Sequence, residues 1–440
     1  MPQKSDNQKQ LRKDIRLLGN ILGQVILQQA GPEIYGLVER IRSLAKSRRR
    51  NSDPVTDAEL SNFVDNLSLD EKEAVARAFT LYFELINLAE EHHRVRVLRD
   101  RERKARGEPQ KESIAAALAT LSRMGVKEED VAQMLNRLQV ELVFTAHPTE
   151  NKRRTILSKL RRIALALYEL EQHDPLPTEA ETLITAIQAE ITSLWLTHRS
   201  RTLKPTVKDE VRTGLWHFYS TLWQVIPQVY DAMDKAVQKY YPNIAMPKRF
   251  LTFGTWIGGD RDGNPYVTTA VTADALYRYR RLAAESHAAA IQKIGRSLSI
   301  SSRLIEPSPE LLSLQDEYED GTFEHVDRLR RRYRSETYRL VASNLAQELE
   351  RTHDDNVAAR LLGEAVEPLP KVRQAADILR PLSVMYDSLR ASGLAEIARV
   401  NLNRIFYQAE VFGLHMAHLD IRQYSSQHHQ VLAEILGKLG

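Results

Sequence analysis

The sequence has no cysteine among its 440 residues. This absence excludes disulfide bonds, thiolate metal sites and a cysteine nucleophile, and it fits a cytoplasmic protein. A metal would have to bind through carboxylates, histidines or carbonyl oxygens, which suit Mg²⁺ or Mn²⁺ better than structural zinc.

Long apolar runs are also missing, so no segment reaches the roughly 18 residues that a membrane helix requires. The polar N-terminus, residues 1–14, has no apolar core of the kind that marks a secretory signal. A net charge of +4 is too small to indicate nucleic-acid binding. The arginine runs at 48–50 and 330–332 lack interleaved aromatic residues and are typical of solvated helix faces. We therefore expect neither a membrane nor a nucleic acid as partner.

Helical periodicity dominates what is present. Apolar residues from Leu11 to Val25 recur at alternating spacings of four and three, and Gly31-Pro32 is expected to end that helix. Ser68 and Glu71 match a capping box that opens a second helix. Further long helices are predicted near residues 154–172, 180–199, 208–241, 272–298, 324–353 and 370–405.

Three short apolar segments, Leu142–Thr145, Phe250–Trp256 and Val411–Ile421, are predicted to be buried strands. The long helical connections between them favour parallel strands over hairpins. The fold class is therefore α/β and dominated by helices. We expect a helical leader region over residues 1–139 and strand-bearing sequence over 140–440.

The segment Val143–Glu150 runs from a strand through His147 into the start of a helix. Free N–H groups and the dipole at a helix N-terminus attract anions, and Arg153 and Arg154 add positive charge. A histidine in that position can act as an acid or a base. A buried structural histidine explains the pattern equally well.

The glycine-rich segment Gly254–Pro265 follows the second predicted strand, and Asp260 and Asp262 flank Arg261 within it. Its glycines permit tight turns and close approach of the backbone to a ligand. Taken alone, the pattern favours a self-paired surface turn, because Asp, Gly, Asn and Pro are common in such turns. A calcium-binding loop is a poor alternative, because the EF-hand spacing and its closing glutamate are missing.

The segment Phe412–Gln423 ends in Asp420 and Arg422. A guanidinium at the carboxyl end of a strand can bind phosphate or carboxylate bidentately. An Asp–Arg structural pair is a slightly better interpretation of this segment in isolation. His147 and Arg422 both follow predicted parallel strands, however, and α/β barrels hold their active sites at that edge.

The adjacent histidines His92 and His93 lie in the predicted helical segment Asn87–Arg96. They face directions about 100° apart and cannot form a metal-binding pair of the i, i+4 type. A polar helix face packed against other helices is the favoured interpretation.

These residues resemble phosphoenolpyruvate carboxylases. The resemblance is carried by blocks that occur in the family's order: LRKDIRLLGNILG at Leu11–Gly23, NLAEEHHRVR at Asn87–Arg96, FTAHPTE at Phe144–Glu150, GTWIGGDRDGNP at Gly254–Pro265 and LDIRQ at Leu419–Gln423. The FTAHPTE and GTWIGGDRDGNP blocks together are specific to that family.

The resemblance implies an enzyme that joins bicarbonate to phosphoenolpyruvate, giving oxaloacetate and phosphate through carboxyphosphate and the enolate of pyruvate. It further implies dependence on Mg²⁺ or Mn²⁺, no biotin, a cytoplasmic homotetramer and a helix-elaborated (β/α)₈ barrel of the TIM type. The matching catalytic residue is His147, which would stabilise carboxyphosphate and handle a proton. Arg422 matches an arginine that contacts the substrate phosphate, and Trp256 matches a tryptophan near its methylene group. Arg261 is expected near the active site.

Two departures qualify the resemblance. The family's enzyme is about twice this length, and its metal-binding carboxylates and catalytic lysine lie in the other half. We therefore expect the chain to be the amino-terminal part of the barrel, to lack the metal site, to be inactive alone and to expose apolar surface. At Leu196–Arg199 the family more often has an acidic pair. The leading alternative function is a non-enzymatic helical scaffold or regulatory fragment.

Overall fold

The computed structural model describes residues 3–51, 54–105, 107–145, 152–172, 175–198, 205–319, 328, 330–353 and 371–439. Their contacts group the chain into two units, each assembled from two stretches of sequence. Unit 1 combines Met1–Gln110 with Thr149–Thr202, and unit 2 combines Lys111–Pro148 with Leu203–Gly440. The two helices between residues 111 and 139 thus pack in unit 2. The division of the chain into a helical leader region and strand-bearing sequence at residue 140 stays a prediction.

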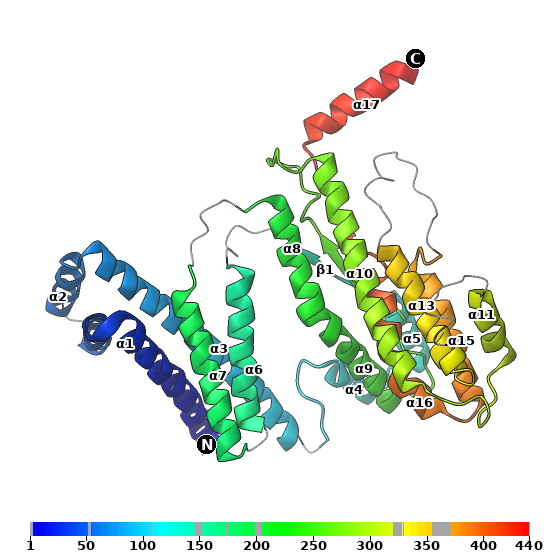
Figure 1. The fold of residues 1–440 in the computed structure, drawn as a ribbon, viewed down its shortest axis with the longest axis horizontal. Coiled ribbons are helices and arrows are strands. Elements are labelled where there is room, and N and C mark those ends of the chain that lie inside the picture. Colours follow the sequence, from blue (N-terminus) through cyan, green and yellow to red (C-terminus); the bar gives the residue numbers. More distant parts are fainter. Residues whose placement is uncertain are drawn as a thin grey trace. The chain divides into compact units, whose positions relative to one another are not determined.

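Unit 1 is a bundle of helices around an aliphatic core (Figure 1). Its helices are α1 (Gln3–Asn51), α2 (Pro54–Asp65), α3 (Leu69–Lys104), α6 (Arg154–Gln172) and α7 (Pro177–Leu196). The predicted capping box is confirmed, since Ser68 and Glu71 exchange backbone-to-side-chain hydrogen bonds of 2.7 and 3.3 Å. The predicted break in α1 is confirmed at Gly31 (φ 85°, ψ 170°), but a second helical stretch follows it immediately.

A buried ionic network joins three helices of unit 1. Arg96 of α3 donates from Nη2 to Asp14 of α1 at 2.7 Å and from Nε to Glu171 of α6 at 2.6 Å. His92 Nε2 lies 2.6 Å from the same Glu171 carboxylate. Burial alone would raise the pKa of Glu171, but its bonds to Arg96 and His92 lower it overall. The interpretation of this segment as a polar face packed against other helices agrees with these contacts.

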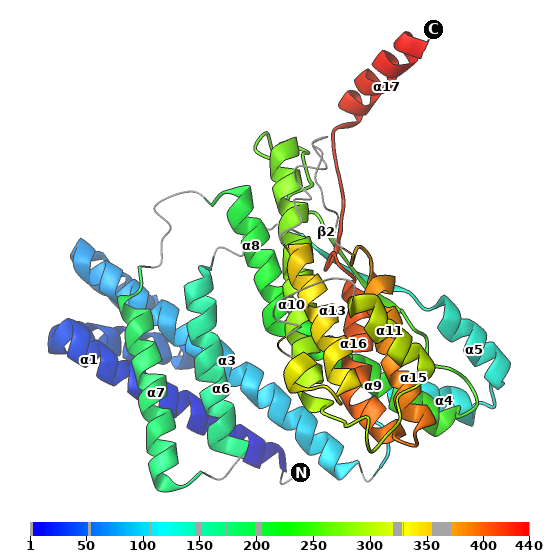
Figure 2. The same ribbon diagram turned by 45° about the vertical axis from the view of Figure 1, so that its right-hand side comes forward.

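Unit 2 surrounds a small sheet with helices. Its elements are α4 (Ile114–Arg123), α5 (Glu128–Arg137), β1 (Val140–Phe144), α8 (Val207–His217), the π-helical turn η1 (Phe218–Leu222), α9 (Trp223–Tyr240), β2 (Leu251–Thr255), α10 (Thr269–Ser297), α11 (Pro309–Glu319), α13 (Thr337–His353), α15 (Ala375–Ala391), α16 (Ala395–Phe412), β3 (His418–Leu419) and α17 (Ser425–Leu439). Helices α10 and α13 run side by side (Figure 2). Two predicted helices are each divided, the first by η1 and the second between α15 and α16.

The three described strands form one parallel sheet in the order β1–β2–β3. Parallel pairing, predicted from the long connections, is confirmed. Burial of all three strands was wrong, because β2 is wholly buried whereas Val140, Leu142 and Val143 of β1 are 40–45% exposed. The third strand is also shorter than predicted, since Val411 and Phe412 belong to α16.

Aromatic rings attach the sheet to its helices. Phe253 of β2 stacks on Phe412 of α16 with ring centroids 5.6 Å apart and meets Phe218 of η1 edge-on at 5.4 Å. Phe144 of β1 lies 5.0 Å from the same Phe218 ring. Such contacts add about 0.5–1.5 kcal/mol each beyond the area that they bury. They anchor β1 and β2 to η1 and α16. Within the described residues, none of the helices combines the length and apolar character needed to cross a bilayer.

Replacing Arg96 by methionine should destabilise unit 1 selectively. The substitution leaves the buried carboxylate of Asp14 and the partly buried carboxylate of Glu171 without the guanidinium that they share, so we expect a loss of about 3 kcal/mol. Hydrogen exchange measured by mass spectrometry should show faster exchange in α1, α3 and α6. Arg94→Met, on an exposed position of the same helix, is the matched control. Equal protection in both variants would show that the network does not stabilise the bundle.

Candidate functional site

The predicted site residues in the described part of unit 2 meet at the carboxyl edge of the sheet. The backbone N–H of Trp256, just after β2, donates to Phe144 of β1 at 2.9 Å. The N–H of Asp420 donates to Thr255 at 2.9 Å, and the N–H of Arg261 donates to the carbonyl of Arg422 at 3.0 Å. Main-chain bonds therefore bring Trp256, Arg261 and Arg422 together from segments more than 150 residues apart.

The side chains of Trp256, Asp420 and Arg422 form one assembly. The indole Nε1–H of Trp256 donates to Asp420 Oδ2 at 3.0 Å. The guanidinium carbon of Arg422 lies 3.7 Å from the centre of the indole ring, which is cation–π geometry. The Asp–Arg pair favoured by the segment alone is wrong, because the carboxylate of Asp420 accepts from the indole and Arg422 stacks on its face.

Arg422 retains its hydrogen-bonding capacity in this arrangement. Its side chain is exposed and forms no hydrogen bond or ion pair with any residue that the structure describes. The stacked ring restricts the orientation of the planar guanidinium while leaving its N–H groups free. A cation that is positioned but not neutralised is suited to binding a phosphate or carboxylate.

Close backbone contact at Gly259 makes this geometry possible. A Cβ atom built on Gly259 would lie 2.2 Å from the carbonyl oxygen of Asp420, a distance that no side chain tolerates. The neighbouring Gly258 has a φ of 93°, in the region that favours glycine. Gly259 therefore serves the approach of the loop after β2 to the chain after β3, whereas a Cβ on Gly258 would meet Ala275 of α10 at 2.7 Å.

The loop after β2 forms the turn that its composition predicts. Asp260 Oδ1 accepts from the N–H of Asp262 at 3.2 Å. Self-pairing within the turn was only partly right, since Arg261 forms no ion pair with either aspartate and its Nη2 points to Thr272 Oγ1 at 3.5 Å. Its buried Nε has no hydrogen-bond partner among the described residues. A cavity of about 390 Å³ lies beside it, lined also by Tyr424 and other residues of this edge.

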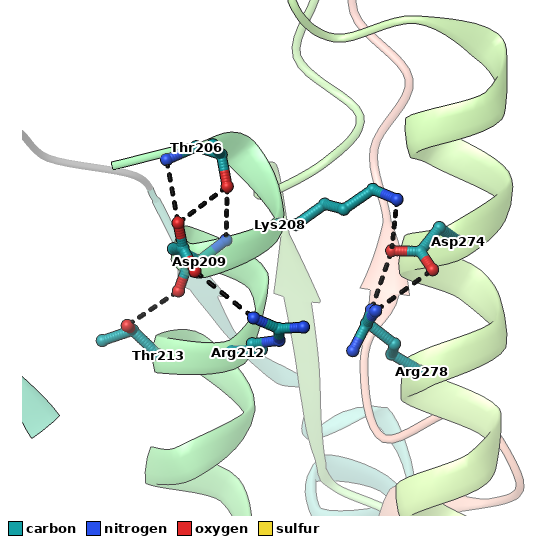
Figure 3. A network of polar contacts seen from close by, with 7 residues as sticks. All are labelled: Thr206, Lys208, Asp209, Arg212, Thr213, Asp274 and Arg278. Atoms are coloured by element: carbon teal, nitrogen blue, oxygen red, sulfur yellow. Dashed lines mark hydrogen bonds and ion pairs between the residues drawn. The ribbon is translucent and has the colours of Figure 1, made fainter. Parts of the chain in front are cut away.

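A polar network fixes the helices on either side of this loop (Figure 3). Thr206 and Asp209 cap the N-terminus of α8 reciprocally, with backbone-to-side-chain bonds of 3.1 and 3.3 Å. Asp274 of α10 accepts from Arg278 at 2.7 Å and lies 4.0 Å from Lys208 Nζ of α8. These contacts hold the start of α8 against α10.

Two residues of α10 hold the end of β2 and its loop through hydrogen bonds that the sequence did not predict. Thr272 of α10 donates to the carbonyl of Gly258 at 2.8 Å, and Tyr279 donates to Thr255 Oγ1 at 3.4 Å. Burial raises the pKa of Tyr279 to about 12, so its hydroxyl remains a donor. Both residues come from a helix interior where ordinary amphipathic patterning gives no signal of a role at the site.

The segment that leads into β3 depends on a buried histidine. His287 of α10 has its Nε2 2.8 Å from the carbonyl oxygen of Gly413, which can only accept, so Nε2 carries the proton. Its buried Nδ1 has no partner among the described residues. Burial lowers the pKa of His287 to about 4, outweighing the bond to Gly413. A neutral imidazole is therefore required in the folded protein.

The predicted catalytic histidine and the metal site remain to be placed. His147 lies outside the described residues, as does Arg199 of the atypical Leu196–Arg199 segment. Among the residues that the structure does describe, no group of three or more His, Asp or Glu side chains is arranged to hold a metal ion. The described residues do not fit a metal centre, so no chemical step is assigned to one.

The chain is thus a helix-rich α/β protein with an exposed, stacked arginine at the carboxyl edge of a parallel sheet. The phosphoenolpyruvate carboxylase family model matches residues 11–440, and the chain belongs to that family. The resemblance found in the sequence is thus confirmed.

Curated relatives carry the same family name. The phosphoenolpyruvate carboxylase of Roseiflexus castenholzii is 41% identical over 436 residues, which are 98% of this chain and 46% of the relative. Those of Rhodothermus marinus and an Azoarcus species are 35% and 34% identical, each over 98% of this chain and 45% and 46% of the relative. The chain therefore spans about half the length of the curated relatives it matches.

The stability of unit 2 should fall as the pH falls below about 6.5. The folded-state pKa of His287 is depressed, so the unfolded chain takes up a proton first, and the loss continues down to about pH 4. His287 alone should account for about 2 kcal/mol between pH 7 and pH 5. His287→Gln, which keeps an N–H donor for Gly413, should show a shallower pH dependence.

This pH dependence is measurable by urea unfolding followed by tryptophan fluorescence. In a Trp195→Phe background the signal comes from the three remaining tryptophans, all of which belong to unit 2. Parallel pH profiles for the His287→Gln variant and its background would contradict the assignment.

Proposed function

We propose that this chain is the amino-terminal portion of a phosphoenolpyruvate carboxylase, which converts bicarbonate and phosphoenolpyruvate to oxaloacetate and phosphate. The observation that carries the proposal is the guanidinium of Arg422 held 3.7 Å above the indole of Trp256, with no carboxylate of the described residues bound to it. Both substrates are anions, and preorganised positive charge that is not already neutralised binds and stabilises such species.

The residues at the carboxyl edge have distinct proposed roles. Arg422 binds the phosphate of phosphoenolpyruvate through its free N–H groups, and the Asp420 contact keeps the Trp256 ring in place beneath it. Trp256 then presents apolar surface to the methylene carbon that attacks the carboxyl donor. Arg261 adds positive charge beside the adjoining cavity. Carboxyphosphate and the enolate would need a site closed to water, which limits their hydrolysis and protonation.

His147 is the proposed acid–base residue. It follows Phe144, the last residue of β1, by three positions, and Phe144 is bonded to the backbone of Trp256. Three residues span at most about 10 Å. An imidazole can stabilise carboxyphosphate by donating a hydrogen bond and can accept the proton of the carboxyl group as the carbon–carbon bond forms.

The sheet is the proposed first part of a helix-elaborated (β/α)₈ barrel. β1 occupies an edge of the described sheet with 40–45% exposure at three apolar side chains. Val431, Leu432 and Leu436 of α17 are likewise 56–65% exposed. Strands and helices from a region matching the other half of the relatives would cover these surfaces. We further propose a cytoplasmic homotetramer that uses Mg²⁺ or Mn²⁺, without biotin.

The 440-residue chain should not catalyse the reaction alone. The family resemblance assigns the metal ligands and a catalytic lysine to the other half, so phosphate release from phosphoenolpyruvate and bicarbonate should stay at background. A protein that joins this chain to the other half should release phosphate and form oxaloacetate together. Turnover by the 440-residue chain would contradict the division of the site between the halves. Failure of the joined protein would favour the scaffold alternative.

In the joined protein, two substitutions should separate binding from chemistry. Arg422→Gln should raise KM for phosphoenolpyruvate by about 10–100-fold, because a charge-assisted contact to phosphate is lost. His147→Asn should reduce kcat by at least about 100-fold while substrate binding largely survives. Arg303→Gln, at an exposed position in the same unit, is the control. An equal effect of His147→Asn on binding and turnover would indicate a structural histidine.

A further inference from the structure

A groove of about 660 Å³ lies entirely within unit 1 and is used by nothing described so far. Its walls come from the stretch of α1 before Gly31, the stretch of α1 after Gly31, and α3. The first wall includes Arg12 and Arg16, which belong to the sequence block at Leu11–Gly23. The proposed carboxylase site gives that block no role.

The kink at Gly31 creates the groove. Residues 23 and 35 would lie about 18 Å apart along an uninterrupted helix. Instead, a Cβ on Gly23 would lie 3.3 Å from the ring of Tyr35, and a Cβ on Gly19 would lie 3.9 Å from the ring of Tyr82 on α3. Two glycines one turn apart thus allow two phenol rings to lie against the α1 backbone. The result is an aromatic floor.

Unpaired cations stand on both sides of this floor. Arg12 and Arg16 share one helix face, and Lys46 lines the opposite wall. None of the three forms an ion pair with a residue that the structure describes, whereas Arg42 is bound to Glu39, the one acidic residue of the lining. Like charges four residues apart destabilise a helix unless something neutralises them. A bound anion would relieve that repulsion.

We propose that this groove binds a small phosphorylated molecule with at least two negative charges and a planar ring. Its phosphates contact Arg12, Arg16 and Lys46, and its ring lies on Tyr35 and Tyr82. The volume is within the range of about 300–1,000 Å³ that small-molecule pockets occupy. Cationic ligands are disfavoured by the surplus of positive charge, and a purely apolar ligand would make no use of the unpaired guanidinium and ammonium groups.

Titration calorimetry on the 440-residue chain tests this site without any catalytic assay. Pyrophosphate and ADP are the probes, in low-salt buffer without added metal. Both should bind saturably, and ADP should bind more tightly because its base contacts the floor. Arg12→Gln combined with Arg16→Gln should weaken both by about tenfold or more. Tyr35→Leu should weaken ADP while leaving pyrophosphate within about twofold.

The matched control is Lys9→Gln combined with Lys13→Gln, which removes two charges with the same spacing from the same helix outside the groove. Its affinities should stay within about twofold of the unsubstituted chain. If both double variants bound the probes equally weakly, the binding would come from diffuse electrostatic attraction, and the proposed site would be wrong. Absence of saturable pyrophosphate binding at millimolar concentration would also overturn it, and ADP binding no more tightly than pyrophosphate would overturn the ring contact. Circular dichroism checks that each variant is folded; the four positions of the two double variants are exposed, and Tyr35 is half-buried.

Discussion

The approach of Gly259 to the carbonyl of Asp420 is the constraint on which the candidate active site depends. A side chain at residue 259 would meet that oxygen at 2.2 Å, so only glycine lets the chain after β3 run beside the loop after β2. This contact aligns the N–H of Arg422 with the carbonyl of Gly259. The indole of Trp256 can then reach Asp420 and lie beneath the guanidinium of Arg422. Backbone proximity therefore comes first, and the side-chain chemistry follows from it.

The same edge shows why an arginine suits this position better than a lysine would. A lysine ammonium is a strongly hydrated point charge on a flexible stem, whereas a guanidinium is planar and can lie flat on an indole while its N–H groups point outward. The Asp420 carboxylate accepts from the indole, so it does not neutralise the cation that the ring supports. The indole of Trp256 thus keeps the carboxylate of Asp420 from pairing with the guanidinium of Arg422, two residues later in the sequence.

Local signals in the sequence were sufficient for most of the long helices, the cap at Ser68 and the parallel pairing of the strands. They did not reveal shorter helices such as α4, α5 and α11, or the interruption at η1. Ser68 and Glu71 act on one another within a single turn, and the long connections already excluded hairpins. What failed depended on distant partners. The exposure of the β1 side chains depends on what packs against the faces of that strand. The predicted Asp420–Arg422 pair failed because Trp256, 164 residues away, binds the carboxylate. The family resemblance predicted that Arg422 and Trp256 belong to one site. Hydrophobic periodicity could not predict this.

Charge balance gives the unpaired cations their meaning. The chain has 62 basic and 58 acidic side chains, so carboxylates are nearly sufficient to pair every cation. At Arg96, two carboxylates from other helices are brought to one buried guanidinium, and the pairing holds a bundle together. Arg422, Arg12 and Arg16 form no ion pair with a described carboxylate. The first stacks on an indole ring, and two tyrosine rings line the groove that the other two border. A ring can orient a cation without satisfying its hydrogen bonds, which leaves them for an anion. Arginine therefore has two different roles in this chain. A neutralised arginine stabilises the fold, and an arginine without an ion-pair partner is available to a ligand.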